Sequence, residues 1–254
     1  MPCAVSLTMI GDGDPPANVY RILHANLLKW IAAASSDVAD VLHDRPVRKP
    51  FTLAGLRADR ETGAWRWRVT LLDDRLLEPL LAGGRSVGVL DLNGSEVPVA
   101  WSDIRVRTKQ YDDLVSKATE ARYLNVRFVS PTTFRQGRLD LPLPEPGAVF
   151  HSWLSRWNDF APPHLRMSTE LLDVVHEHVA VAHIGQLHTQ RHDLGRSSPV
   201  GFVGAVTFAI TRARRLSRVD VTRLNALADY AEFCGTGRKT TQGMGQTRQI
   251  GRAA

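Results

Sequence analysis

Gly235-Thr-Gly-Arg-Lys-Thr-Thr-Gln-Gly-Met-Gly-Gln-Thr-Arg248 is the most distinctive stretch of the chain. Two Gly-x-Gly pairs bracket Arg238 and Lys239, and residues 235–254 contain four cations and no carboxylate. Glycine permits positive φ angles and close backbone approach, so the N–H groups of such a loop can surround a phosphate. The glycines match neither a Walker loop nor a dinucleotide-binding fingerprint. The stretch predicts an ordered anion-binding loop, and the alternative is a basic disordered tail.

Residues 233–246 also resemble the C-terminal glycine-rich signature of the CRISPR repeat-processing endoribonucleases of the repeat-associated mysterious protein superfamily. Further segments match this family in the same order, and the match is strongest after residue 120: Leu42-His43 with Lys49-Pro-Phe-Thr52, Ser130–Arg135, Phe150–Phe160 and Gly201–Val206. The resemblance implies an α+β fold made of tandem ferredoxin-like (RRM-like) domains with a C-terminal glycine-rich loop.

The residue pattern upstream of this signature predicts elements in the order of a ferredoxin-like unit. In the first half we expect strands at 5–10, 51–57, 64–72, 87–92 and 97–109, and helices at 17–34, 37–42 and 75–81, the last ending at Gly83-Gly84. In the second half we expect strands at 123–129, 179–187 and 202–210, helices at 149–160, 169–176 and 221–233, and a short final strand. Residues 141–147 read as a stiff proline-rich connector. We therefore predict an N-terminal domain at 1–118 and a C-terminal domain at 119–254.

Composition narrows the class of protein. A hydrophobic content of 43% with 23% charged residues predicts a packed globular core, and no membrane-spanning run or signal peptide is apparent. Only Cys3 and Cys234 are present, which favours a cytoplasmic protein without a disulfide framework. Residues 1–118 carry 15 basic and 15 acidic residues, whereas residues 119–254 carry 17 and 11. The net charge of +6 therefore lies in the second half, which indicates a localised surface for a polyanion.

His43 and Lys49 are the predicted catalytic residues. RNA can be cleaved by its own 2′-hydroxyl, so neither a metal nor another cofactor is expected. Histidine suits proton transfer near neutral pH, and lysine can offset charge on the phosphorane. The family resemblance implies a Tyr–His–Lys triad whose tyrosine precedes the histidine by about four helical turns. Leu28 stands near that point and Tyr20 lies two turns too early, which leaves the second acid/base group open.

The glycine-rich loop supplies the predicted RNA-binding residues, which are Gly235, Gly237, Arg238, Lys239, Thr240, Gly243, Gly245, Gln246 and Arg248. Trp65-Arg-Trp-Arg68 and Arg105-x-Arg-x-Lys109 are alternating patterns that fit either an RNA-binding strand or a half-buried strand with a solvated charged side. Trp153 and Trp157 are four residues apart in the helix expected at 149–160, a spacing that predicts two core side chains on one helical face. The histidines between 176 and 192 lack the pattern of a metal site. His24 and His151 fit structural roles, although His151 is the alternative catalytic histidine.

These features together predict a metal-independent endoribonuclease that cuts CRISPR repeat RNA and leaves 2′,3′-cyclic phosphate and 5′-hydroxyl ends. The alternative is a non-catalytic RNA-binding subunit of a CRISPR effector complex, which the missing tyrosine favours. We expect repeat RNA as the partner, with possible effector-complex subunits, a monomer or homodimer, and no membrane association.

Overall fold

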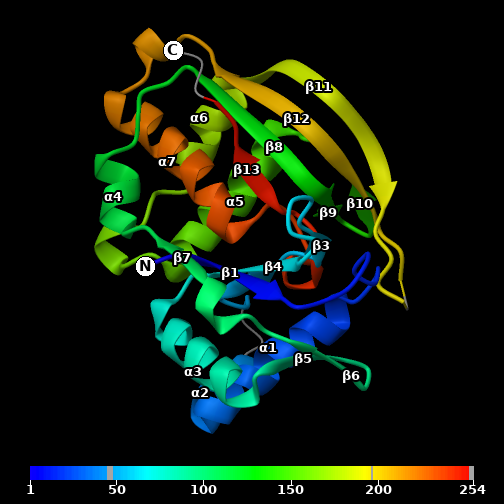
Figure 1. The fold of residues 1–254 in the computed structure, drawn as a ribbon. Helices are drawn as coiled ribbons and strands as arrows, with labels where there is room; N and C mark the ends of the chain where they lie inside the picture. Colours follow the sequence, from blue (N-terminus) through cyan, green and yellow to red (C-terminus); the bar gives the residue numbers. More distant parts are fainter. Residues whose placement is uncertain (45–47, 196, 252–254) are drawn as a thin grey trace. The chain divides into compact units, whose positions relative to one another are not determined.

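The computed structural model describes residues 1–44, 48–195 and 197–251 (Figure 1). Contacts between residues divide the chain into two compact units. The first unit consists of Met1–Thr108, Asp193–Ser197 and Thr241–Gly243, and the second consists of Lys109–His192, Ser198–Thr240 and Met244–Ala254. The main division falls before the boundary expected at residue 118, because α4 (Tyr111–Ser116) packs with α7 (Arg218–Cys234) of the second unit.

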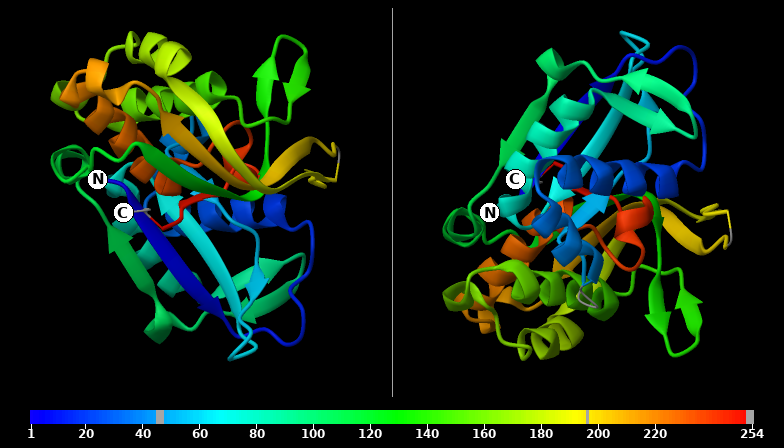
Figure 2. Two further views of the ribbon diagram at one scale, coloured as in Figure 1. Left: turned by 90° about the horizontal axis from the view of Figure 1, so that it is seen from above. Right: turned by 90° about the horizontal axis from the view of Figure 1, so that it is seen from below.

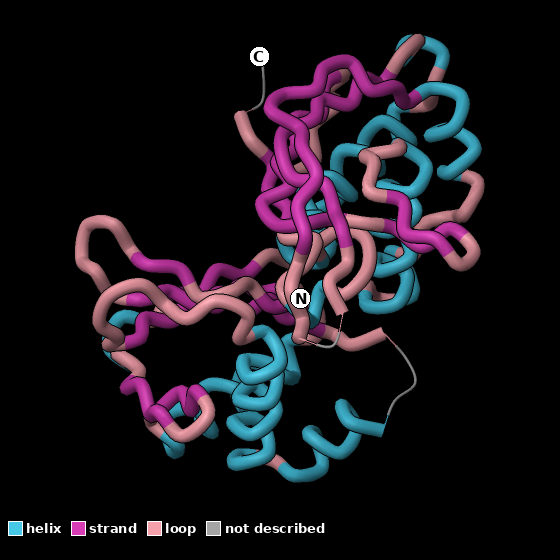
Figure 3. Tube along the Cα trace, turned by 90° about the vertical axis from the view of Figure 1, so that its right-hand side faces the viewer, coloured by secondary structure: helices cyan, strands magenta, loops and turns pink. Residues whose placement is uncertain are grey.

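An antiparallel sheet forms the first unit. Its strand order is β2-β4-β1-β7, and the bounds are β1 Cys3–Met9, β2 Phe51–Leu53, β4 Trp65–Leu71 and β7 Arg105–Thr108, with β3 Arg57–Ala58 paired to β4. Helices α1 (Tyr20–Ala34), α2 (Ser36–Asp44) and α3 (Leu77–Val87) lie on one side of this sheet (Figure 3). The first and third long strands are central, which is the ferredoxin-like order. The intervening pieces are η1 Asp74–Leu76, β5 Val89–Leu92, β6 Ser95–Pro98 and η2 Trp101–Asp103.

Close packing of α1 against α3 corrects one sequence-based expectation. We expected the third helix to end at Gly83-Gly84, but α3 continues to Val87, and Gly88 closes it in the left-handed conformation. A Cβ atom on Gly83 would stand 1.7 Å from the carbonyl oxygen of Trp30 in α1. The two glycines therefore permit close contact between the helices rather than ending α3.

The second unit repeats the fold with its own antiparallel sheet. Its strand order is β11-β12-β8-β13, and the bounds are β8 Tyr123–Thr132, β11 Val179–Arg191, β12 Val200–Ile210 and β13 Thr247–Gln249. The helices are α5 Pro146–Phe160, α6 Leu171–His178 and α7, with short turns at η3 Pro163–Leu165, η4 Ala213–Arg215 and η5 Thr240–Gln242. The predicted tandem ferredoxin-like fold is thus confirmed.

A two-stranded hairpin replaces part of the expected connector. Strands β9 (Phe134–Gln136) and β10 (Leu139–Leu141) pair with each other and project from the second unit in both views of Figure 2. The proline-rich residues 142–145 then lead into α5. The second unit's core is rich in aromatic side chains, and Trp153 and Trp157 are fully buried in it, as their spacing predicts. No helix in the described ranges is long and apolar enough to cross a bilayer.

Candidate functional site

The first turns of α1 bring two titratable side chains onto one helical face. Tyr20 and His24 are four residues apart, so both point to the same side of the helix. The His24 ring lies edge-on to Phe51, with ring centroids 5.4 Å apart. Its Nδ1 atom is 3.2 Å from the carbonyl oxygen of Thr241, which belongs by its contacts to the same unit. The chain end and the first helix thus contribute to one cluster.

The surroundings of His24 favour its neutral form. Burial lowers the pKa of this imidazole below its ordinary value, the bond to the Thr241 carbonyl opposes that change, and the positive charge of Lys49 lowers the pKa further. A carbonyl oxygen can only accept a hydrogen bond, so Nδ1 carries the proton. The other ring nitrogen, Nε2, is then unprotonated and able to accept a proton.

Lys49 links this cluster to the end of α2. Its ammonium group donates a hydrogen bond to the carbonyl oxygen of Leu42, the residue before His43. His43 lies in the last turn of α2, and its side chain is outside the described part of the structure. The cation predicted to stabilise charge is therefore held beside the backbone of the predicted catalytic histidine and within electrostatic reach of His24. The sequence spacing suggests that Lys49 acts together with His43, whereas only the fold reveals the electrostatic effect of Lys49 on His24.

The position expected for a tyrosine has no acid/base group. Leu28 is partly buried and packs against the first unit's hydrophobic core. Tyr20 instead lies beside Gly243 of the same unit, because a Cβ atom added to Gly243 would stand 2.1 Å from its Cδ1 and Cε1 atoms. Burial raises the pKa of the Tyr20 hydroxyl, while the charge of Arg57 opposes that rise. The tyrosine packs against Gly243 and is not at the position that the family triad implies.

Replacement of Gly243 tests this packing. Its φ is +85°, so Gly243→Ala introduces both backbone strain and a clash with Tyr20. Gly13 has a similar φ of +67° with nothing near its Cβ position, so Gly13→Ala introduces the strain alone. We expect chemical denaturation to show a loss of about 1–2 kcal/mol for Gly13→Ala and a further 1–3 kcal/mol or so for Gly243→Ala. Equal losses for the two variants would contradict the proposed contact, and Tyr20→Ala should relieve the excess in the double variant.

Most N–H groups of the glycine-rich loop are already bonded inside the second unit. Donor–acceptor distances of 2.8–3.3 Å join internal acceptors to the N–H groups of Gly235, Thr236, Gly237, Arg238, Met244, Gly245 and Gln246. An N–H that donates inside the protein is not available to a phosphate. The expectation that the loop backbone surrounds phosphate is therefore wrong for these residues in this conformation.

Two of the other family-like segments meet at this loop, which explains why they occur together with it. From the segment 130–135, Ser130, Pro131 and Thr133 accept loop N–H groups. From α5, Ser152 accepts the N–H of Gly237, and the buried Arg156 donates to the carbonyl oxygen of Gly237 at 2.6 Å. The signature thus builds an ordered loop on a fixed scaffold, and a disordered tail is excluded for residues 235–249.

The side chains predicted to bind RNA differ in their exposure. Thr240 and Gln246 are buried, and Arg156 donates to the Thr240 hydroxyl at 3.1 Å. Arg238 pairs with Asp140 of β10. Lys239 is half-buried at a φ of +57°, and burial lowers the pKa of its ammonium group, with the charge of Arg238 adding to the effect. Arg248 is exposed on β13. Of the predicted side-chain contacts, Arg248 is the most accessible.

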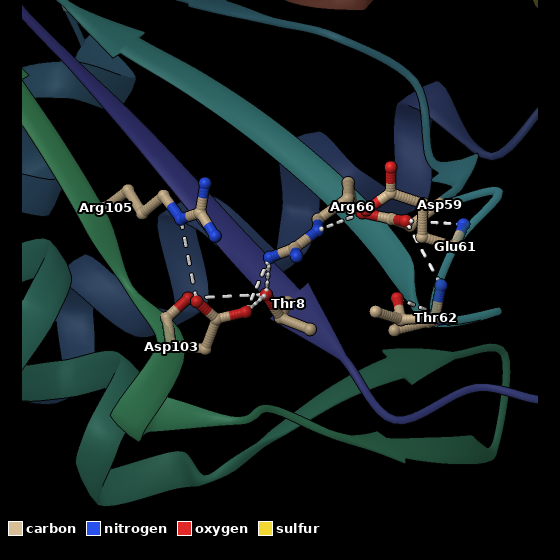
Figure 4. A network of polar contacts seen from close by, with 8 residues as sticks. Thr8, Asp59, Glu61, Thr62, Arg66, Asp103 and Arg105 are labelled. Carbon is tan, nitrogen blue, oxygen red and sulfur yellow. Dashed lines mark hydrogen bonds and ion pairs between the residues drawn. The ribbon is translucent and has the colours of Figure 1, made fainter.

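The tryptophans of β4 belong to the core and not to an RNA-stacking surface. Trp65 and Trp67 are buried, while Arg66 on the other side joins a polar network shown in Figure 4. The Arg66 guanidinium lies 3.1 Å from Asp59 and 2.7 Å from Asp103, and Asp103 also accepts from Thr8 at 2.7 Å. The charge of Arg66 is thus compensated within the unit, which favours the structural interpretation of this strand.

This network predicts acid sensitivity of the fold. The pKa of Asp103 is lowered by hydrogen bonds from Thr8 and Arg66, and that of Asp59 by the N–H of Glu61 and by Arg66. Because the unfolded chain binds these protons more readily, the stabilisation is complete above the ordinary value of 3.8 and is lost as the pH falls below it. Arg66→Gln should flatten this decline in urea titrations at a series of pH values. Arg85→Gln, which removes an exposed charge on α3, should leave it unchanged.

The histidines between 176 and 192 are dispersed. His176, His183 and His188 are exposed, whereas His192 is buried. In the described ranges, no group of three His, Cys, Asp or Glu side chains is placed to hold a metal ion. His151 is exposed on α5 of the second unit.

Comparison with known proteins gives consistent results. A sequence model of the family described as "CRISPR-associated endoribonuclease Cas6" matches residues 126–247. A protein of that description from Streptococcus thermophilus is 22% identical over 237 residues, which cover 91% of this chain and 92% of that protein. Another, from Mycobacterium tuberculosis (strain CDC 1551 / Oshkosh), is 23% identical over 256 residues, which cover 95% of this chain and 77% of that protein.

Solved structures resemble the whole chain. Thermus thermophilus Cas6 is 28% identical with a TM-score of 0.75, and the match covers 98% of each chain. A Cas6 product complex, also 28% identical, has a TM-score of 0.85 and covers 98% of this chain and 100% of that one. A Cas6-related protein from Pyrococcus furiosus shares the fold at 13% identity, with a TM-score of 0.62 and 98% coverage of both chains.

Proposed function

We propose that this chain, like the CRISPR-associated endoribonucleases that it resembles over most of its length, cleaves CRISPR repeat RNA without a metal ion. The ribose 2′-oxygen attacks the adjacent phosphorus, and a base takes its proton. The bond from phosphorus to the 5′-oxygen breaks, and an acid gives that oxygen a proton. The products carry a 2′,3′-cyclic phosphate and a 5′-hydroxyl, and the protein forms no covalent intermediate.

We assign the proton transfers and charge stabilisation to the cluster in the first unit. The observation that carries this assignment is the position of Lys49, which bonds to the carbonyl before His43 and electrostatically affects His24. His43 would act as one of the two proton-transfer groups, and Lys49 would offset charge on the phosphorane. His24 would act as the general base, a role that the missing tyrosine leaves open, because its imidazole is neutral and its Nε2 atom is unprotonated.

For RNA binding we propose the glycine-rich loop and the strand that follows it. Arg238, Lys239 and Arg248 would supply positive charge to phosphate groups. The loop residues Gly235, Gly237, Thr240, Gly243, Gly245 and Gln246 would contribute chiefly by fixing the shape on which those cations are carried. This role differs from direct backbone contact, which the internal hydrogen bonds disfavour.

A second candidate function is that of a non-catalytic RNA-binding subunit within a CRISPR effector complex. The observation that favours it is Leu28, a partly buried apolar side chain at the position where the family triad has a tyrosine. A chain of this kind would bind repeat RNA, as a monomer or homodimer or with other subunits, and leave it intact.

Incubation of the purified chain with repeat RNA in excess EDTA tests the proposal. The RNA should be that of a CRISPR array beside the coding region. We expect cleavage at one position, a 5′-hydroxyl that polynucleotide kinase labels without prior phosphatase treatment, and a cyclic phosphate that acid opens. Intact RNA that nevertheless binds tightly would support the second candidate, and restoration of cleavage by a divalent ion would refute the metal-free mechanism.

A further inference from the structure

The sheet of the second unit has one face without helices. Helices α5, α6 and α7 cover the other face, where alternating strand residues such as Val126, Phe128 and Phe208 are buried (Figure 3). The residues between them point to the open face. They are Tyr123, Asn125 and Arg127 on β8, Ala205, Thr207 and Ala209 on β12, Ala180, His183 and Gly185 on β11, and Arg248 on β13.

Two arginines stand directly opposite each other on this face. Arg127 of β8 is the register partner of Arg248 of β13, and both side chains are exposed. Partners on adjacent antiparallel strands have Cβ atoms about 5 Å apart, and like charges in such positions destabilise a sheet. Among the described residues, neither arginine makes an ion pair or a hydrogen bond through its guanidinium. The protein therefore keeps an uncompensated pair of positive charges on β8 and the edge strand β13 of a folded sheet.

The neighbours of the pair leave space and add no negative charge. Across the sheet, Ala205 of β12 is the register partner of Arg127, and Gly185 of β11 is the register partner of Ala205. The next row contains Asn125, Thr207 and His183, and the Thr207 hydroxyl donates to Asn125 at 2.7 Å. No Asp or Glu is among the residues on the open face named above. A surface of small and polar side chains beside two guanidinium groups suits a chain of phosphates and sugars.

We propose that Arg127 and Arg248 together hold one phosphate of a single-stranded RNA segment that crosses the open face of the second unit. The inference rests on the proposed function in taking the anion to be an RNA phosphodiester. Guanidinium groups bind phosphate oxygens in bidentate fashion, and an anion between them converts their repulsion into attraction. Arg248 ends the glycine-rich stretch 235–248, whereas only the strand register identifies Arg127 as its partner.

The test uses the full chain with Arg127→Gln, Arg248→Gln, both together, and Arg166→Gln as control. Arg166 is an exposed arginine that follows η3 of the same unit, outside the sheet, so its replacement removes equal charge. The probes are the repeat RNA and a short fluorescent oligouridylate, titrated over a range of KCl concentrations. Each single variant should weaken binding roughly tenfold and lower the salt slope by about one unit. In the double variant the second replacement should lower the affinity for RNA less than the first, because both side chains contact the same phosphate.

A second readout is independent of RNA. Without RNA and at low salt, each sheet variant should melt at a higher temperature than the parent, because replacement removes the repulsion, and Arg166→Gln should not. Parent-like affinity and salt slope in both single variants would overturn the inference. A parent that binds RNA without cutting it would refute the proposed function while leaving the binding comparison readable. A parent that binds neither probe would refute both.

Discussion

His43→Ala should slow cleavage of the repeat RNA by roughly two to four orders of magnitude, the usual contribution of a general acid or base. The affinity for RNA should change little, because phosphate contacts by arginine and lysine dominate binding. Single-turnover rates with protein in excess measure the chemical step, and a parallel titration with uncleaved RNA measures affinity. A lowered rate at unchanged affinity is the expected combination.

Three matched variants locate the other groups of the cluster. Lys49→Met should also slow the chemical step, since it removes the cation held beside α2. His24→Gln should do so if Nε2 of His24 is the base, and a merely structural His24 would change the melting temperature but not the rate. His151→Ala is the control, because His151 is exposed on α5 of the second unit. A normal rate in His43→Ala with a slow His151→Ala would transfer the catalytic role to His151.

Much of the fold follows from local patterns. Apolar residues at helical spacing mark α1, and alternation marks β4 and β8, so the ferredoxin-like order of elements is readable from the sequence. The prediction that Gly83-Gly84 ends the helix is wrong, because a glycine that ends a helix and one that admits a neighbouring helix look alike in sequence. Only the approach of Trp30, distant in the chain, distinguishes them. The short β9–β10 hairpin and α4 contain too few residues to show a period.

The site was less predictable because its contacts join distant residues. Glycines and cations in residues 235–248 indicated an anion-binding loop, yet the partners of its N–H groups lie in segments 130–135 and 146–160. His24 shows an apolar helical context in sequence, and its relation to Lys49 and Thr241 depends on tertiary structure. Trp65 and Trp67 had two interpretations, and burial selects the core. The predicted roles of His43 and Lys49 in catalysis remain predictions.

The central claim is that the ribose 2′-hydroxyl is the nucleophile and that the protein acts through its own side chains. A single 2′-deoxy substitution just upstream of the scissile phosphate removes this nucleophile without removing a phosphate. The substituted repeat RNA should therefore bind like the unmodified RNA but give no product at that position, because no other group is proposed to attack. The same substitution one nucleotide further upstream is the control and should be cut normally.

The most direct measurement is single-turnover cleavage of these two RNAs in excess EDTA. The account predicts full cleavage of the control RNA and no cleavage of the RNA that lacks the 2′-hydroxyl at the cut site, with equal affinity for both. Cleavage of both RNAs, or a requirement for a divalent ion in cutting the control, would contradict it.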